Sequence, residues 1–449
     1  MKLDIKDCGD YVKVRIPSDF DLLDCHASAP QRYPFLLESN NANHSENSFD
    51  ILFAFPEEKV ESFSLKDDCF FSKFDESFNR NKKYNSSEEL PFTGGWFVFL
   101  SYELVGAIEE KLSGLKVDES LPLASAVRIP LAIIKSHHDK SCWIVCESGK
   151  EALIEQVLID VKKATPGELT LPTVTLNEAP PKLFLEGVKR IKSYLLEGDT
   201  LQVNLSRQWT GQVTNNSHYL DVYRSLRMHN PSPFAGLACY NKSVICSSSP
   251  ERLINNMDNV VQMRPIAGTR PRHEDEVLDN KYAEELLLNA KESAEHIMLI
   301  DLIRNDLGRI CQTGTVKVDE KMTLESYAAV HHIVSNVSGK LSSGTTPSDV
   351  IKAVFPGGTI TGCPKVRCIE IINELEDSPR GAYTGSMGYI NRNGDLDLNI
   401  LIRTFTINGT QLTLRTGAGI VADSIADNEL EETRHKAKAL LDAVNIHDA

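Results

Sequence analysis

The sequence predicts an α+β fold, in which strands and helices follow one another without a regular alternation. Residues 1–160 hold several short strand-like runs separated by charged and Asn/Ser-rich stretches, and residues 183–445 interleave further strands with helices. Such an irregular order favours α+β over a repeated βαβ arrangement. The 449 residues are 41% hydrophobic and 25% charged, which is typical of a globular protein with a large core and excludes a mainly disordered or fibrous chain.

The N-terminal part, residues 1–165, is predicted to be a domain built mainly from strands. Residues 151–163 are predicted to form an amphipathic helix. The segment ATPGELTLPTVTLNEAPPK (164–182) has four prolines and no helical period, which is linker composition, and we place the linker at residues 166–182. Apolar runs in this part predict strands at Tyr11–Ile16, Ile51–Phe55, Trp96–Leu100, Ala126–Ile134 and Cys142–Val145.

The C-terminal part, residues 183–449, is predicted to be a second domain with longer helices. Apolar residues at helical spacing predict helices at Leu183–Leu196, Tyr282–Arg309, Asp349–Val354, Val366–Leu375 and Asn428–Val444. Shorter apolar runs predict strands at Thr200–Leu205, Val244–Ser247, Arg252–Ile254, Val260–Met263, Gly388–Ile390, Asp397–Phe405 and Gln411–Thr416.

The charge balance argues against large anionic partners. Lys and Arg total 48 against 63 Asp and Glu, for a net charge of −15, which would repel nucleic acid. No apolar run reaches the roughly 18 residues of a spanning helix, so no membrane contact is expected. The charged start MKLDIKDCGDYVKVRIP has no apolar signal core, and the ten cysteines are scattered without a CxxC pair, so we expect a cytoplasmic protein.

Two acidic helix positions are candidate ligands for a hard cation. Glu295 lies beside the apolar face of the predicted 282–309 helix, and Glu432 forms an i,i+4 pair with Lys436 on the last helix. Mg²⁺ takes one or two carboxylates, several waters and an anionic substrate. On spacing alone, two solvated surface glutamates remain the competing interpretation.

Three further residues carry acid–base or anion-binding chemistry. Alternation in DLNILIRTF would place Arg403 on one face with Leu401 and Phe405, where it needs either a substrate carboxylate or an internal salt bridge. Glu251, at a strand break in SSSPER, is a candidate proton donor or an ordinary surface carboxylate. His332, between apolar residues in AVHHIVS, is a candidate site residue or a hydrogen-bonded core histidine.

Glycine-rich segments supply backbone N–H groups that can approach an anion closely. They are PIAGT (265–269), FPGGTITGCPK (355–365) and GAGI (417–420). None has the GxxxxGK[ST] spacing of a nucleoside-triphosphate loop. Each of them could also be a simple tight turn.

Taken together, the motifs resemble the chorismate-utilising enzymes, which include component I of anthranilate synthase and of aminodeoxychorismate synthase. The resemblance covers roughly residues 183–445 and extends to PFLLES (34–39) and LPFTGGWFVFLSYEL (90–104) in the N-terminal part. It implies a fold of two large packed antiparallel β-sheets surrounded by helices. The ordered motifs are GDTLQVNLSR, SSSPERLI, RPIAGTRPR, SAEHIMLIDLIRNDLGR, VHHIVS, FPGGTITGCPKVR, YTGSMGYI, DLNILIRT and GAGIVADS.

The resemblance also implies roles for individual residues. Glu295 and Glu432 would be Mg²⁺ ligands, with the metal holding the ring carboxylate of chorismate. Glu251 would protonate the departing C4 hydroxyl, and His332 would lie beside the ring. The substrate-binding residues implied in this way are Arg403, Tyr383, Thr361, Lys365, Gly417, Gly419, Lys436 and Ala267.

The residue at position 202 indicates whether water or ammonia attacks chorismate. Relatives that add water resemble one another in having a lysine base at this position, whereas ammonia carries its own lone pair and needs no base. Gln202 therefore favours amination, which implies a glutamine amidotransferase (glutaminase) subunit as partner.

Two aminating branches fit the family, with nitrogen entering at C4 for 4-aminobenzoate and folate, or at C2 for anthranilate. Segments such as QVNLSR and YTGSMGY favour the C4 branch, whereas Ala267 stands where many C4 enzymes have a nucleophilic lysine. Leu37, Glu38 and Ser39 match a tryptophan-pocket element of the anthranilate branch, but related C4 enzymes have similar segments, so control by tryptophan does not follow from the match. A catalytically silent regulator that binds chorismate or tryptophan is a third alternative.

Overall fold

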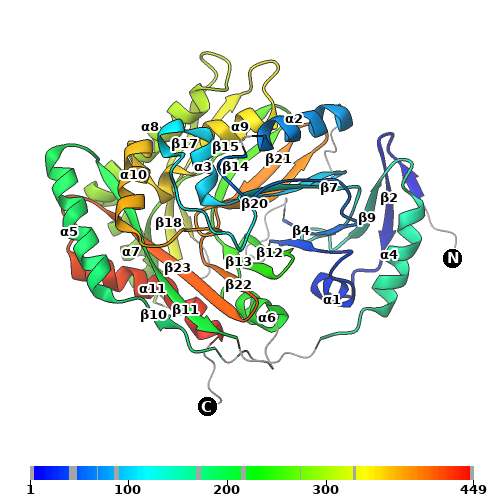
Figure 1. The fold of residues 1–449 in the computed structure, drawn as a ribbon, viewed down its shortest axis with the longest axis horizontal. Helices are drawn as coiled ribbons and strands as arrows, with labels where there is room; N and C mark the ends of the chain where they lie inside the picture. The colour runs from blue at the N-terminus through cyan, green and yellow to red at the C-terminus, as the bar shows by residue number, and fades with distance from the viewer. Residues whose placement is uncertain are drawn as a thin grey trace.

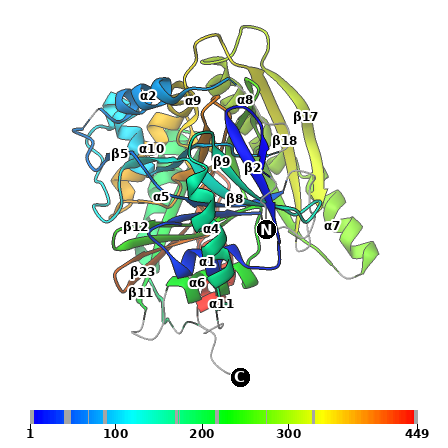
Figure 2. The ribbon, with the colours of Figure 1, turned by 90° about the vertical axis from the view of Figure 1, so that its right-hand side faces the viewer.

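Two large antiparallel β-sheets packed face to face, with helices on their outer sides, make up the computed structural model (Figures 1 and 2). The structure describes residues 5–39, 48–67, 69–84, 90–167, 172, 174–213, 219–273, 275–326 and 330–444. The first sheet has the order β1 (Ile5–Asp7), β2 (Tyr11–Ile16), β9 (Cys142–Glu147), β8 (Leu131–Ser136), β4 (Phe49–Ala54), β3 (Phe35–Glu38), β12 (Phe234–Tyr240), β13 (Ser243–Ser249), β22 (Thr404–Asn408), β23 (Gln411–Ile420), β11 (Gln202–Gln212) and β10 (Asn177–Glu178), and β19 (Gly362–Cys363) also pairs with β11.

The second sheet has β16 and β5 at the two ends of its strand order. Its order is β16 (Ile266–Pro271), β18 (Val330–Lys340), β15 (Val260–Met263), β14 (Arg252–Met257), β21 (Leu396–Asn399), β20 (Ser386–Asn391), β6 (Gly95–Leu100), β7 (Ala124–Ile129) and β5 (Lys59–Ser62), with β17 (Lys317–Ser326) paired to β18. The helices are α1 (Leu22–Ser28), α2 (Phe70–Asn81), α3 (Val105–Ile108), α4 (Ala152–Lys163), α5 (Pro181–Glu197), α6 (Tyr219–His229), α7 (Glu276–Leu288), α8 (Ala290–Gly308), α9 (Pro347–Val354), α10 (Lys365–Leu375) and α11 (Ala426–Val444).

Apolar side chains between the two sheets form the central core. Phe35 of the first sheet stacks on Phe97 of the second, with ring centroids 4.0 Å apart, and Phe53 meets the same ring edge-on. Both sheets therefore bury one face against the other, as alternating strands require. The outer faces are covered by α1, α4, α6 and α11 on the first sheet and by α2, α8 and α9 on the second.

Strands from both halves of the chain share each sheet. In the first sheet β3 pairs with β12, joining residues 35–38 to residues 235–238. In the second sheet β6 pairs with β20, joining residues 95–100 to residues 386–391. The two predicted domains are thus continuous through both sheets, and α5 begins at Pro181 within the predicted linker.

Three sequence predictions of single elements are wrong. The 126–134 strand is two strands, β7 and β8, separated at Pro130, which cannot donate to the ladder. The 282–309 helix is α7 and α8, because Asn289 ends the first helix and its Oδ1 accepts from the N–H of Glu292 at the start of the second. The 397–405 strand is interrupted before Arg403, whose φ of 51° lies in the left-handed region, so Arg403 does not alternate with Leu401 and Phe405.

Candidate active site

The paired strands β11 and β23 carry the centre of the site (Figure 1). A Cβ on Gly419 would lie 2.3 Å from Nε2 of Gln202. A Cβ on Gly417 would lie 2.6 Å from Oδ1 of Asn204 and 2.8 Å from the hydroxyl of Tyr383. A Cβ on Gly417 would also lie 2.9 Å from the backbone oxygen of Leu205, whereas at Gly419 only the end of the Gln202 side chain would have to move. The absence of side chains at both glycines lets polar groups of other elements lie over β23.

Gln202 joins this segment to helix α8. Its Nε2 donates to Oε1 of Glu295 at 2.6 Å. Gln202 is buried and Glu295 is half-buried. The hydrogen bond fixes the orientation of the carboxamide, because a carboxylate accepts only from the amide nitrogen. The Oε1 atom of Gln202 is left buried without a partner among the described residues.

Helix α11 reaches the same segment from the other side. Lys436 Nζ donates to the carbonyl oxygen of Gly417 at 3.0 Å and pairs with Glu432 Oε1 at 2.7 Å. Glu432 and Lys436 are each about half exposed. Glu295 on α8 therefore contacts Gln202, which lies over Gly419. Glu432 on α11 contacts Lys436, which donates to Gly417, two residues before Gly419 on β23.

This donor set fits a hard cation. Among the described residues no three His, Cys, Asp or Glu side chains cluster as a complete metal cage. Mg²⁺ does not need one, because it keeps several waters and uses one or two carboxylates. Glu292, one turn before Glu295 on α8, pairs with Arg270 at 2.8 Å, and its Oε2 is buried without a partner among the described residues. Arg270 thus leaves one oxygen of Glu292 without a described cationic partner near Glu295.

Glu251 has the surroundings of a neutral carboxylic acid. It is 8% exposed, and Thr359 donates to its Oε1 at 2.8 Å. Burial raises the pKa of Glu251 to about 7, and the Thr359 hydrogen bond and the Lys436 ammonium oppose this rise without overcoming it. The burial that the proton-donor hypothesis requires is therefore present.

Arg403, directly before β22 of the first sheet, lies near His332 on β18 of the second sheet. Burial lowers the pKa of His332 and its Nδ1 lies 3.3 Å from the carbonyl oxygen of Gly268, while the Arg403 guanidinium lowers the same pKa further. Burial also lowers the pKa of Arg403. Within the part of the chain that the structure describes, the Arg403 guanidinium has no ion pair or hydrogen bond. A partly buried cation in this condition calls for an anionic ligand.

Tyr383 is held at the site by a buried charge cluster. Arg380 lies over its ring at 5.6 Å and donates to Glu376, which also accepts from Arg415 at 2.8 Å. Burial raises the pKa of Tyr383 to about 12, so the hydroxyl stays protonated and can donate.

Two predicted substrate-binding residues have other partners. The Oγ1 of Thr361 donates to the carbonyl oxygen of Gly357 at 3.0 Å, within its own loop. Lys365 Nζ pairs with Asp306 at 2.8 Å and donates to the carbonyl oxygen of Val354. These contacts stabilise the loop after α9 and do not place either side chain with Glu251 or Gln202.

The predicted tryptophan-pocket residues line a separate pocket of about 90 Å³ between the two sheets. Leu37, Glu38, Ser39 and Phe234 line it at the paired strands β3 and β12 of the first sheet, and Arg252 lines it from β14 of the second sheet. The carboxylate of Glu38 does not face the pocket freely, because it accepts from Tyr223 at 2.6 Å and from Arg227 at 2.9 Å.

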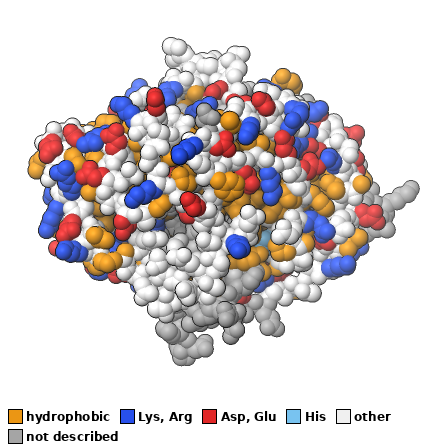
Figure 3. Space-filling model, in the orientation of Figure 1, with side chains coloured by type: hydrophobic (Ala, Val, Ile, Leu, Met, Phe, Trp, Pro, Cys, Tyr) orange, Lys and Arg blue, Asp and Glu red, His pale blue; other side chains and the backbone are white. Residues whose placement is uncertain are grey.

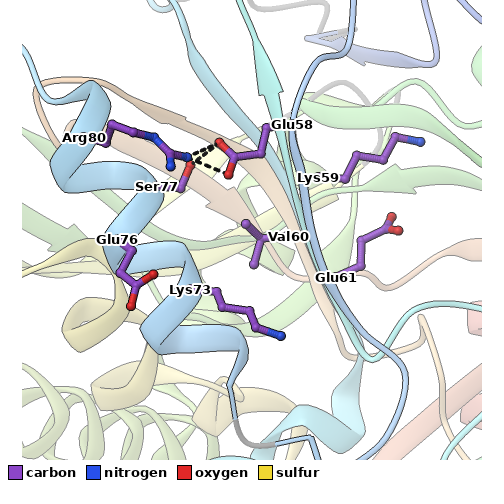
Figure 4. A pocket seen from close by; sticks show the side chains of 8 residues that line it. All are labelled: Glu58, Lys59, Val60, Glu61, Lys73, Glu76, Ser77 and Arg80. Carbon is purple, nitrogen blue, oxygen red and sulfur yellow. Dashed lines mark hydrogen bonds and ion pairs between the residues drawn. The ribbon is translucent and has the colours of Figure 1, made fainter.

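A second pocket, of about 230 Å³, lies between β5 and α2 (Figure 4). Arg80 and Glu58 face each other across it as an ion pair at 2.6 Å, with Ser77 also donating to Glu58. None of the predicted site residues lines it. On the face of the molecule that Figure 3 presents, acidic and basic side chains are mixed, so the net charge of −15 is not gathered into one patch there.

Ala267 pairs through its backbone with Ile333, and its side chain lies outside the described part of the structure. Sequence reasoning missed Asn204 and Glu292. Each could have been found from its spacing, because Asn204 is two residues after Gln202 on one strand face and Glu292 is three residues before Glu295 on one helix face. The Glu376 cluster has no comparable local signal.

The sequence is similar to those of known proteins named as component I, or component I-like, proteins of anthranilate synthase or aminodeoxychorismate synthase. The chain is 43% identical over 366 residues to an anthranilate synthase component I-like protein of Synechocystis, covering 81% of this chain and 75% of that protein. It is 40% identical to aminodeoxychorismate synthase component 1 of Bacillus subtilis, covering 83% and 82%, and 40% identical to anthranilate synthase component 1 of Thermus thermophilus, covering 80% and 79%.

Solved structures share the fold. The crystal structure of anthranilate synthase component I from Streptococcus pneumoniae matches with a TM-score of 0.79 at 31% identity, covering 87% of this chain and 92% of that chain. The menaquinone-specific isochorismate synthase of Escherichia coli matches with a TM-score of 0.75 at 17% identity, covering 98% and 95%, which is a likeness of fold alone. The family model described as chorismate binding enzyme matches residues 33–442, and the chain therefore belongs to the chorismate binding enzyme family.

Proposed function

We propose that this protein aminates chorismate at C4 and forms 4-amino-4-deoxychorismate, the precursor of 4-aminobenzoate in folate biosynthesis. The observation that carries the proposal is the environment of Glu251, whose buried carboxyl has its pKa raised to about 7. Hydroxide is a poor leaving group, and a carboxylic acid still protonated near neutral pH can donate the proton that turns it into water.

The reaction balances with ammonia as the second substrate. The nitrogen lone pair forms the new C4–N bond while the C4–O bond breaks, and the departing oxygen takes the proton of Glu251 and leaves as water. The nitrogen then gives up one proton, which restores Glu251. Ammonia comes from glutamine through a glutaminase subunit, and the Synechocystis and Bacillus relatives are themselves named as component I proteins.

Chorismate is a dianion, so a protein of net charge −15 needs local positive charge to hold it. Glu295 and Glu432 would hold Mg²⁺, which when bound supplies a positive charge for the ring carboxylate. Arg403, whose guanidinium has no partner within the described residues, and Lys436 supply the remaining positive charge. The Tyr383 hydroxyl and the backbone at Gly417 and Gly419 complete the contacts to the carboxylates and the enolpyruvyl arm.

The C2 branch is the second candidate, because Ala267 cannot act as a nucleophile and several relatives are named anthranilate synthase component 1. The C4 branch is favoured by the motifs around Gln202, Glu251 and Tyr383. Because Ala267 offers no nucleophile, the C4 reaction would proceed in one of two ways. Ammonia enters at C4 directly, or another group, such as water, attacks C2 first.

The test is an incubation of the purified protein with chorismate, Mg²⁺ and ammonium, followed by aminodeoxychorismate lyase. The proposal predicts 4-aminobenzoate that appears only after the lyase is added. Direct release of fluorescent anthranilate would instead establish the C2 branch. Chorismate binding without turnover under either nitrogen source would overturn both and support a silent regulator.

The pocket of Leu37, Glu38 and Ser39 is proposed to bind tryptophan. Its walls combine the Phe234 ring with the Arg252 guanidinium, 4.9 Å from that ring, and with Asp397, which pairs with Arg252 at 2.8 Å. An aromatic amino acid matches such apolar and charged walls. We expect L-tryptophan at millimolar concentration to raise the melting temperature, with L-alanine as the control; an equal response to both would contradict this assignment.

The protein is proposed to act in the cytoplasm, where chorismate is available. Across the described residues, no helix combines the length and the apolar character that crossing a bilayer requires.

A further inference from the structure

Two carboxamide oxygens at the centre of the site have no hydrogen-bond donor. Oε1 of Gln202 and Oδ1 of Asn204 are both buried, and neither has a partner among the described residues. Buried amide oxygens are normally paired, because leaving one unpaired costs on the order of 1–3 kcal/mol. Two such atoms, from side chains on the same face of one strand, therefore indicate a ligand that donates hydrogen bonds.

The strand geometry places both side chains on one face. Gln202 and Asn204 are two residues apart on β11, so their side chains leave the same face with Cα atoms about 6.7 Å apart. The amide nitrogen of Gln202 lies over Gly419 of β23, and the amide oxygen of Asn204 lies over Gly417. The two side chains thus stand side by side above the glycine segment.

The backbone N–H and carbonyl groups of Asn204 both have hydrogen-bond partners, so a substitution of its side chain leaves these bonds in place. Its backbone N–H donates to the carbonyl oxygen of Thr361 at 2.9 Å, and its carbonyl oxygen accepts from Arg380 at 2.8 Å. The side chain stabilises none of these contacts. Strand pairing with β23 also needs only the backbone.

We propose that Asn204, together with Gln202, binds the ammonia that attacks chorismate, and that Asn204 is a specificity-determining residue of the proposed amination. Ammonia has three N–H donors and one lone pair. Two amide oxygens can accept two of its hydrogens at ordinary distances of about 2.9 Å and leave the lone pair directed at the substrate.

A neutral acceptor suits this ligand better than a charged one. A carboxylate at position 204 would favour ammonium over ammonia, because a nearby negative charge stabilises the protonated form. Ammonium has no lone pair and cannot attack carbon. The amide oxygens of Gln202 and Asn204 hold the N–H groups without that penalty.

The experiment compares steady-state kinetics of the wild type with Asn204→Leu and Asn204→Asp, using free ammonium as the nitrogen source. Leucine keeps the shape of asparagine and removes the acceptor, so KM for ammonia should rise at least about 10-fold, equivalent to roughly 1.4 kcal/mol. KM for chorismate should stay within about twofold. Aspartate should lower kcat/KM, calculated on free ammonia, and move the rise of activity to higher pH.

Gln208→Leu is the matched control. Gln208 is a carboxamide on the same face of β11, four residues from Asn204, and its Oε1 accepts from Ser378 at 3.5 Å, outside the site. It should leave both KM values unchanged. An unchanged KM for ammonia in Asn204→Leu would overturn the inference, as would an equal rise in KM for chorismate.

The inference rests on the proposed function, and the two can fail separately. A wild type that releases no aminated product refutes the function itself. A wild type that makes the aminated product, with an Asn204→Leu variant of normal ammonia KM, refutes only the ammonia site. The melting temperature of each variant, expected within about 2 °C of the wild type because the side chain makes no hydrogen bond to the described residues, separates misfolding from lost binding.

Discussion

A carboxyl group donates a proton near neutral pH only where its surroundings disfavour the anion, and Glu251 has such surroundings. It is almost completely buried, accepts one hydrogen bond from Thr359, and has only the partly exposed Lys436 as a neighbouring cation. Glu295 and Glu432 differ, because one is hydrogen-bonded to Gln202 and the other is half exposed beside Lys436. The surroundings thus distinguish Glu251, a candidate acid, from Glu295 and Glu432, the candidate metal ligands.

Replacing Glu251 by Gln should reduce kcat by at least about 100-fold, because the isosteric amide cannot donate a proton to the leaving oxygen. In the wild type, the required form is the protonated one, so the rate per free ammonia should be constant at low pH and fall as the pH rises through about 7. The pH–rate profile of kcat measures this. A profile that rises through pH 7, after correction for free ammonia, would show that Glu251 acts in its ionised form.

At the scale of the elements, β23 has Gly417 and Gly419, over which the side chains of Asn204 and Gln202 on β11 lie. Replacing Gly417 by Ala would put a methyl group 2.6 Å from Asn204 and 2.8 Å from the Tyr383 hydroxyl. Overpacking of this kind costs about 1–3 kcal/mol, and kcat/KM for chorismate should fall at least 10-fold. Gly114→Ala, where nothing lies within 4 Å of the added Cβ, is the control. Normal kinetics in Gly417→Ala would mean that this segment does not contact substrate.

Helix α11 is expected to bring Glu432 to the metal. In Glu432→Gln the Mg²⁺ concentration for half-maximal activity should rise at least about 10-fold, while the melting temperature changes little, since exposed ion pairs contribute under about 1 kcal/mol. Glu431→Gln is the control, because Glu431 has an equivalent surface pair with Arg434. An unchanged Mg²⁺ requirement in Glu432→Gln would reject it as a ligand.

Sequence patterns predicted most elements and failed where one residue breaks a periodic run. Pro130 and Asn289 each divide a run whose apolar spacing continues on both sides, and spacing alone does not register a missing N–H or a cap. Arg403 was expected on a strand face, whereas it lies in the break between β21 and β22, where its φ is positive. That it has no ion pair with a described residue depends on contacts between elements distant in sequence, which periodicity does not encode.

At the scale of the whole molecule, the N-terminal strands complete both sheets. β3 covers the edge of β12, and β6 covers the edge of β20. Without residues 1–165, two long strand edges and the core around Phe97 would be open to water. Residues 183–449 are therefore expected to depend on residues 1–165 for their fold.

A fragment of residues 183–449 should fail to unfold cooperatively and should have no activity, as measured by circular dichroism and product assay. Mixing it during refolding with residues 1–182 should restore measurable turnover, because the strand pairings across the two halves can form between separate chains. The full chain refolded in parallel is the control. A 183–449 fragment that is cooperatively folded and active alone would establish independent domains.

The central claim, that nitrogen enters at C4 of chorismate, is tested most directly with ¹⁵N-ammonium. The protein, Mg²⁺, chorismate and the label are incubated, and the product is analysed by heteronuclear NMR. The account predicts ¹⁵N coupled to C4 of a product that retains its enolpyruvyl group. Coupling of ¹⁵N to the aromatic ring of anthranilate, with release of pyruvate, would contradict it.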